Sequence, residues 1–131
     1  MPAYKIKREK FYLDAGYKQR EWQRLCDDAL DRQDKRFVCA FAYPRSGKSF
    51  WAAHYVAPRL LAPDHHAWIV APTYELGSKE FMYVYNMLLE LGYLNMRGVT
   101  KHKDVSGGNM DITFPWGSFL RVRSAEHTTG L

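Results

Sequence analysis

The sequence predicts an α/β fold, in which strands and helices alternate along the chain. Three observations predict it. The apolar run 36–42 is typical of a buried strand, and residues 50–57 after it contain no helix breaker. A second apolar run, 67–71, precedes a long helical pattern, and two alternating segments near the C-terminus favour a β-hairpin. The expected order is strand, loop, helix, strand, helix, strand, strand.

Two segments precede the first strand. Residues 1–16 form a basic arm with interleaved aromatic rings, which either contacts a phosphate backbone or packs its rings on the body; the pattern favours packing. Residues 18–32 predict a helix. Its apolar face comprises Trp22, Leu25, Cys26, Ala29 and Leu30. No repeat or linker divides residues 17–131, which we expect to form one core.

The loop between the first strand and the first helix, residues 42–49, has the pattern A-x-x-x-x-G-K-S. It matches the phosphate-binding P-loop, with Ala42 in place of the first glycine. Backbone N–H groups would surround the phosphates together with the positive end of the helix dipole. The residues of this cradle are Pro44, Arg45, Ser46 and Gly47. We expect Lys48 to reach the β- and γ-phosphates and the Ser49 hydroxyl to bind Mg²⁺. The alternative is a basic turn between two core elements.

The elements after the loop follow from periodicity and caps. The first helix is expected to end at Pro58, and residues 67–71 to form a second buried strand. The apolar face of that helix comprises Trp51, Ala52, Tyr55 and Val56. Thr73 can cap the next helix, which should run to about Leu91 and stop at Gly92. Its apolar stripe comprises Phe81, Val84, Tyr85, Leu88 and Leu89.

The C-terminal part is predicted to be an irregular basic stretch, 93–108, followed by two strands, 110–114 and 118–123, joined by a tight turn. In an open α/β sheet, a nucleotide should lie at the carboxyl end of the first strand.

Composition narrows the classes of function. With 47% hydrophobic and 25% charged residues, the 131-residue chain is globular rather than disordered. Its net charge of +5 suits an anionic partner such as nucleic acid. No apolar run is long enough to span a membrane, and two cysteines make no disulfide framework, which favours a reducing cytoplasm. His65 and His66 favour the start of a strand over a zinc site.

Four segments together resemble the N-terminal part of the ATPase domain of phage terminase large subunits, the motors that package DNA into procapsids. Residues 17–23 resemble the family's adenine-recognition segment, and residues 44–49 resemble its Walker A loop, which often has an arginine where Arg45 stands. Residues 68–74 resemble the family's strand that ends in A-P-T. Residues 112–125 resemble its hairpin, which has G-S in the turn and S-A at the end of the second strand. The resemblance covers nearly the whole chain. It implies a P-loop NTPase core of the ASCE or RecA-like type.

The resemblance also implies residue roles. Lys48 and Ser49 would bind ATP and Mg²⁺, and Arg45 would contact the γ-phosphate or sense hydrolysis, unless it pairs with a surface carboxylate. Gln23 or Gln19 would bind the adenine edge. Gln23 is slightly preferred because Gln19 belongs to a charged stretch, and a solvated helix glutamine is the alternative. Thr73 would face a DNA channel or only cap its helix, and capping is favoured.

As partners the resemblance implies double-stranded DNA, a terminase small subunit, a portal protein and further copies in a homo-oligomeric ring, in the cytoplasm of a phage-infected cell. The sequence departs from the family pattern because no apolar strand ends in the Asp-Glu of a Walker B motif, and no nuclease domain is present. We therefore expect an N-terminal fragment that binds ATP and hydrolyses little of it alone. Two alternatives stay open: another P-loop nucleic-acid ATPase such as a helicase, and a non-catalytic nucleotide- or DNA-binding module.

Overall fold

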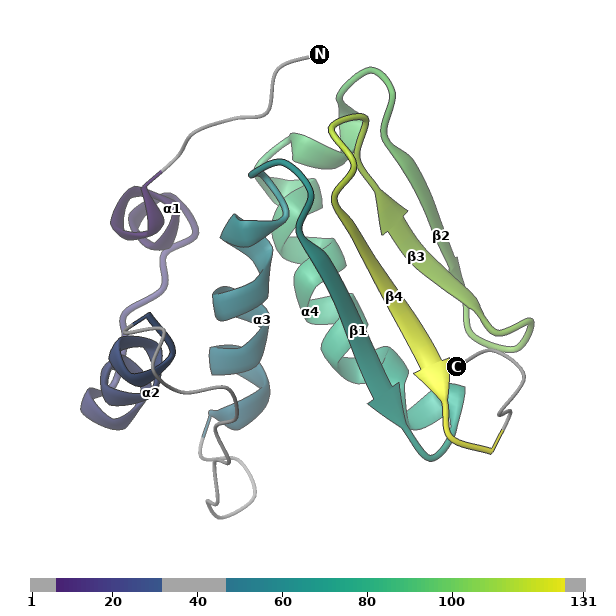
Figure 1. Ribbon diagram of the computed structural model, residues 1–131, viewed down its shortest axis with the longest axis horizontal. Coiled ribbons are helices and arrows are strands. Elements are labelled where there is room, and N and C mark those ends of the chain that lie inside the picture. The colour runs from purple at the N-terminus through teal and green to yellow at the C-terminus, as the bar shows by residue number, and fades with distance from the viewer. Residues whose placement is uncertain (1–6, 32–46, 127–131) are drawn as a thin grey trace.

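A computed structural model describes residues 7–31 and 47–126 of the chain. They form a mixed α/β structure with one four-stranded sheet in the order β1-β4-β3-β2 (Figure 1). The strands are β1 (His66–Ala71), β2 (Thr100–Asp104), β3 (Asn109–Thr113) and β4 (Phe119–Ser124). Strands β1 and β4 are parallel, whereas β2–β3 and β3–β4 are antiparallel. The α/β class is confirmed. The predicted strand 36–42 lies outside the described residues.

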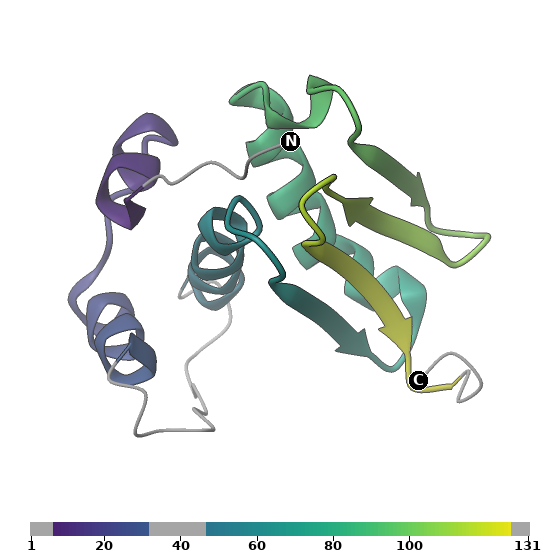
Figure 2. The same cartoon turned by 45° about the horizontal axis from the view of Figure 1, so that its top comes forward.

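Four α-helices and one short 3₁₀ helix accompany the sheet in the described residues. They are α1 (Arg8–Asp14), α2 (Glu21–Asp31), α3 (Lys48–Arg59), α4 (Tyr74–Glu90) and η1 (Tyr93–Asn95). Helix α4 packs on the sheet, α3 packs on α4, and α1 and α2 lie on the far side of α3 (Figures 1 and 2). The helix that carries the end of the P-loop pattern therefore lies in the middle of the molecule.

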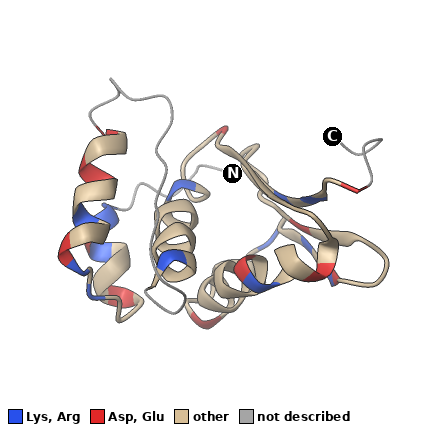
Figure 3. Ribbon diagram, turned by 90° about the horizontal axis from the view of Figure 1, so that it is seen from below, with Lys and Arg blue, Asp and Glu red and all other residues tan. Residues whose placement is uncertain are grey.

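The sheet is covered by helix on one face only in the described part of the chain (Figure 3). Val122 and Ile112 are buried on that face, with Phe81 and Leu88 of α4 in the same core. On the other face, the side chains of Trp68 and Val70 are 50% and 55% exposed. The expectation that residues 67–71 form a buried strand is therefore wrong for the described residues, because β1 alternates between exposed and half-buried positions and no described helix lies on its open side.

The predicted hairpin and the caps of α4 are confirmed. Leu120 pairs with Ile112 across the antiparallel strands β3 and β4. The Thr73 hydroxyl accepts a hydrogen bond from the Leu76 N–H at 3.2 Å, so Thr73 caps α4. Gly92 follows the helix with φ +85°, a conformation that glycine adopts without strain.

The favoured packing of the basic arm is confirmed for Phe11 and Tyr12, which are buried, and residues 8–14 are helical. Two expectations about helices need correction. Helix α3 continues through Pro58 to Arg59, because a proline in the last turn removes only one helical hydrogen bond. The buried positions of α3 are Ala53, His54, Ala57 and Pro58 rather than the predicted face. Helix α3 is packed on two sides, so no single apolar stripe describes it.

The stretch predicted to be irregular contains η1 and strand β2. Strand β2 has the sequence TKHKD and pairs with β3 in register, for example His102 with Asp111. It has no apolar alternation because it is an edge strand, where charged side chains are favoured. Hydrophobic periodicity therefore could not reveal it.

Candidate functional site

The last three residues of the P-loop pattern, Gly47, Lys48 and Ser49, lie at the start of α3. Gly47 has φ +96° and immediately precedes the helix, and its carbonyl accepts the Trp51 N–H at 2.9 Å. A side chain at this φ would be strained, and a Cβ would lie 3.0 Å from the Gln23 amide nitrogen. The positive φ therefore favours glycine here, and a larger residue would also crowd the Gln23 amide.

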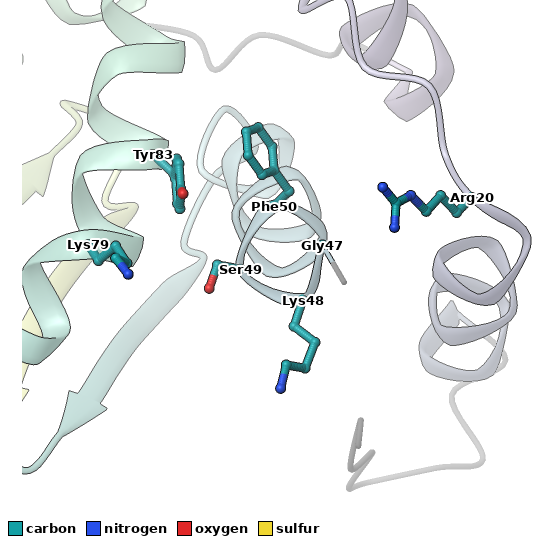
Figure 4. Close-up of a pocket in the computed structure, with 7 residues that line it drawn as sticks. All are labelled: Arg20, Gly47, Lys48, Ser49, Phe50, Lys79 and Tyr83. Carbon is teal, nitrogen blue, oxygen red and sulfur yellow. The ribbon is translucent and has the colours of Figure 1, made fainter. Parts of the chain in front are cut away.

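A cleft of about 410 Å³ lies over this turn. The described residues that line it are Arg20, Gly47, Lys48, Ser49, Phe50, Lys79 and Tyr83. Arg20 projects toward α3 from one side, whereas Lys79 and Tyr83 extend from α4 on the other (Figure 4). Three cationic side chains, from three separate segments, therefore meet at the start of one helix. This arrangement suits a ligand with several negative charges.

The cleft lies at the carboxyl end of the parallel strands. Strands β1 and β4 end at the same edge of the sheet, where Ala71 pairs with Ser124, and both α3 and α4 begin there (Figure 1). The Ser124 hydroxyl donates to the Pro72 carbonyl at 2.9 Å and ties the two strand ends together. Open α/β sheets bind ligands at the carboxyl ends of their strands.

Ser49 contacts a carboxylate of α4. Its hydroxyl donates a hydrogen bond to Oε1 of Glu80 at 2.9 Å, and both residues are partly buried. No group of three or more acidic, histidine or cysteine side chains able to hold a metal occurs among the described residues. Mg²⁺ needs no such cage, since it is commonly held by one or two protein oxygens, phosphates and waters. Ser49 beside Glu80 fits that requirement.

The two candidate adenine residues have different surroundings. Gln23 is 3% exposed; its amide nitrogen donates to the Gly47 carbonyl at 3.1 Å, and its oxygen accepts the Arg20 N–H at 2.8 Å. Gln19 instead donates to the buried carboxylate of Asp27. Gln23 therefore connects the start of α2 to the P-loop glycine, and Gln19 belongs to a separate polar cluster. Their roles toward adenine remain predictions, as neither is among the described residues that line the cleft.

Pro44, Arg45 and Ser46 lie outside the described residues, so the predicted phosphate cradle and the role of Arg45 stay predictions. The structure adds residues to the site that sequence reasoning did not select, namely Arg20, Phe50, Lys79, Glu80 and Tyr83. Nothing in the local pattern of α4 distinguishes its three members, because only the packing of α4 on α3 brings them to Ser49.

An aromatic cluster includes two rings that line the cleft, those of Phe50 and Tyr83. Tyr17 stacks on His54 with ring centroids 3.8 Å apart, and Phe50 lies 4.7 Å from Tyr83. His54 Nδ1 lies 2.7 Å from the Phe50 carbonyl, and because a carbonyl only accepts, Nδ1 carries the proton. Burial lowers the pKa of His54, and burial together with the nearby Asp27 carboxylate raises the pKa of Tyr17 to about 12. Both rings are thus neutral at pH 7 and act as packing surfaces.

Comparison with known proteins gives no match: no protein-family description, curated protein or solved structure is similar to this chain. Each helix in the described residues is too short or too polar to cross a bilayer.

Proposed function

We propose that this chain is the ATP-binding part of a DNA-packaging motor of the terminase large-subunit type, acting in the cytoplasm of a phage-infected cell. The observation that carries the proposal is the cleft at the start of α3, where Lys48, Arg20 and Lys79 meet the positive end of a helix. The order of the four sequence segments gives the proposal its specific family.

In this proposal each residue has a defined task. The Lys48 ammonium neutralises the β- and γ-phosphates, and the Ser49 hydroxyl holds Mg²⁺, which offsets the charge of the triphosphate. Arg20 and Lys79 add positive charge from opposite sides of α3. The contact between Gln23 and the Gly47 carbonyl keeps the loop fixed to α2. Conformational changes that begin at this site would move the bound DNA and the neighbouring copies of the chain.

Replacement of Lys48 by alanine tests nucleotide binding. We expect Lys48→Ala to weaken binding of a fluorescent ATP analogue at least about tenfold, because a charge-assisted phosphate contact is lost. Fluorescence titration in Mg²⁺ measures this, and thermal unfolding verifies that the variant folds. Lys18→Ala is the matched control, since Lys18 is an exposed cation that does not line the cleft.

Two outcomes would contradict the proposal. One is a wild-type chain that shows no binding at millimolar nucleotide. The other is a Lys48→Ala variant that binds the analogue as tightly as the wild type does.

A further inference from the structure

Glu80 lies on the second turn of α4, opposite the first turn of α3. Its carboxylate accepts a hydrogen bond from the Ser49 hydroxyl at 2.9 Å, and the two residues are 31 positions apart in the sequence. The packing of α4 against both α3 and the sheet fixes this contact. Glu80 is therefore an acidic side chain that a hydrogen bond joins to the last residue of the P-loop pattern.

The direction of this hydrogen bond has a chemical consequence. A serine hydroxyl has one proton and two lone pairs. An ionised carboxylate only accepts, so the Ser49 proton is directed at Glu80 and both lone pairs of Oγ are left for a cation. The same bond is charge-assisted and thus restricts the rotation of the Ser49 side chain.

We propose that Glu80 is a positioning residue for the divalent cation of a bound nucleotide. Glu80 directs the Ser49 proton away from the cation, and its carboxylate places a negative charge near the cation. In many metal sites a carboxylate accepts a hydrogen bond from a metal ligand and so orients that ligand. The inference rests on the nucleotide-binding function proposed above and adds a residue that neither the P-loop pattern nor the family resemblance selects.

The charge of Glu80 should change nucleotide affinity in opposite directions with and without a divalent cation. With a divalent cation present, the carboxylate attracts the cation and stabilises the ternary complex. Without the cation, the same carboxylate repels the phosphates. Removal of Glu80 should therefore weaken nucleotide binding in Mg²⁺ but leave it unchanged or tighter in EDTA. A purely structural role would weaken binding in both conditions.

The test compares wild type, Glu80→Ala and Glu80→Gln by titration with a fluorescent ATP analogue, in Mg²⁺ and in EDTA. We expect Glu80→Ala to weaken binding about tenfold in Mg²⁺ only. Glu80→Gln should lose less affinity than Glu80→Ala, because an amide oxygen still accepts the hydrogen bond of the Ser49 hydroxyl. It should lose some affinity, because the amide carries no charge. Electron paramagnetic resonance of Mn²⁺ should show weaker retention of the metal in the order wild type, Gln, Ala.

Glu90→Ala is the matched control, since Glu90 is an exposed glutamate at the other end of the same helix. The role of Glu80 is overturned if Glu80→Ala weakens binding equally in Mg²⁺ and EDTA, or changes it in neither, while wild type still binds. If the wild-type chain binds no analogue in either condition, the proposed function itself fails and this inference fails with it.

Discussion

At the scale of single residues, Asp27 accepts three side-chain hydrogen bonds next to the candidate site. It is fully buried and accepts the Tyr12 hydroxyl at 2.9 Å, the Trp51 indole N–H at 2.8 Å and the Gln19 amide. These donors come from α1, α3 and the segment between α1 and α2. One carboxylate thus joins the N-terminal helices to α3.

Removal of this carboxylate should destabilise the protein. We expect Asp27→Ala to lower the free energy of unfolding by about 3 kcal/mol, because buried donors lose a charged acceptor. Urea denaturation followed by tryptophan fluorescence measures the change. Arg24→Ala is the control, as Arg24 is exposed on the same helix and should change stability by no more than about 0.5 kcal/mol. A loss below about 1 kcal/mol for Asp27→Ala would contradict this role.

Sequence reasoning could not find Asp27. Periodicity placed Leu25 on the inner face of α2, yet Leu25 is 57% exposed, while Gln23 and Asp27 are the buried positions. Their partners lie in α1, in α3 and at Gly47, so burial of these polar groups depends on contacts between distant segments. The same holds for Glu80, whose partner Ser49 is on another helix.

At the scale of elements, the close approach of α4 to the sheet depends on Gly77. A Cβ there would lie 2.8 Å from Cγ1 of Val122 and 3.4 Å from Cβ of Ala71. Val122 is 1% exposed in the middle of β4, so its side chain is surrounded by the core. Glu80 and Tyr83 lie about one and two turns further along the same helix.

Gly77→Ala should therefore destabilise the protein by about 1–2 kcal/mol, even though alanine is the better helix former. In a double-mutant cycle with Val122→Ala, we expect the double variant to be less destabilised than the sum of the single changes, because the clash is removed. Asn86→Ala, at an exposed position of the same helix, is the control. A Gly77→Ala variant more stable than the wild type would show that the sheet accommodates the added methyl group.

At the scale of the whole molecule, the described helices lie on one side of the sheet and leave the other side open (Figure 3). On the open side, the Arg121 guanidinium lies 4.0 Å from the centre of the Phe119 ring, and that of Arg123 lies 5.8 Å from the Trp68 ring. Positive charge and aromatic surface thus occur on the sheet as well as at the cleft.

Net charge is a property of the whole chain, and at +5 it favours the alternative of a DNA-binding module. For a motor part we expect only weak binding of duplex DNA by the isolated chain, with affinity that falls as salt rises. Filter binding over a salt series measures this, with and without nucleotide. Tight, ATP-independent binding with a steep salt dependence would favour the module over the motor.

The sequence by itself determined the elements with strong local signals. Apolar alternation predicted β3 and β4, and the Thr73 cap and Gly92 set the ends of α4. A helix, α3, follows the P-loop pattern as expected. These features depend on a few neighbouring residues, so the local sequence is sufficient to specify them.

Only the tertiary structure decided which side chains surround the cleft. Arg20, Lys79 and Glu80 meet the start of α3 because helices from separate parts of the chain pack together, and the polar edge strand β2 is defined only by its pairing with β3. The physical reason is that these contacts join residues far apart in sequence, where periodicity and capping carry no information.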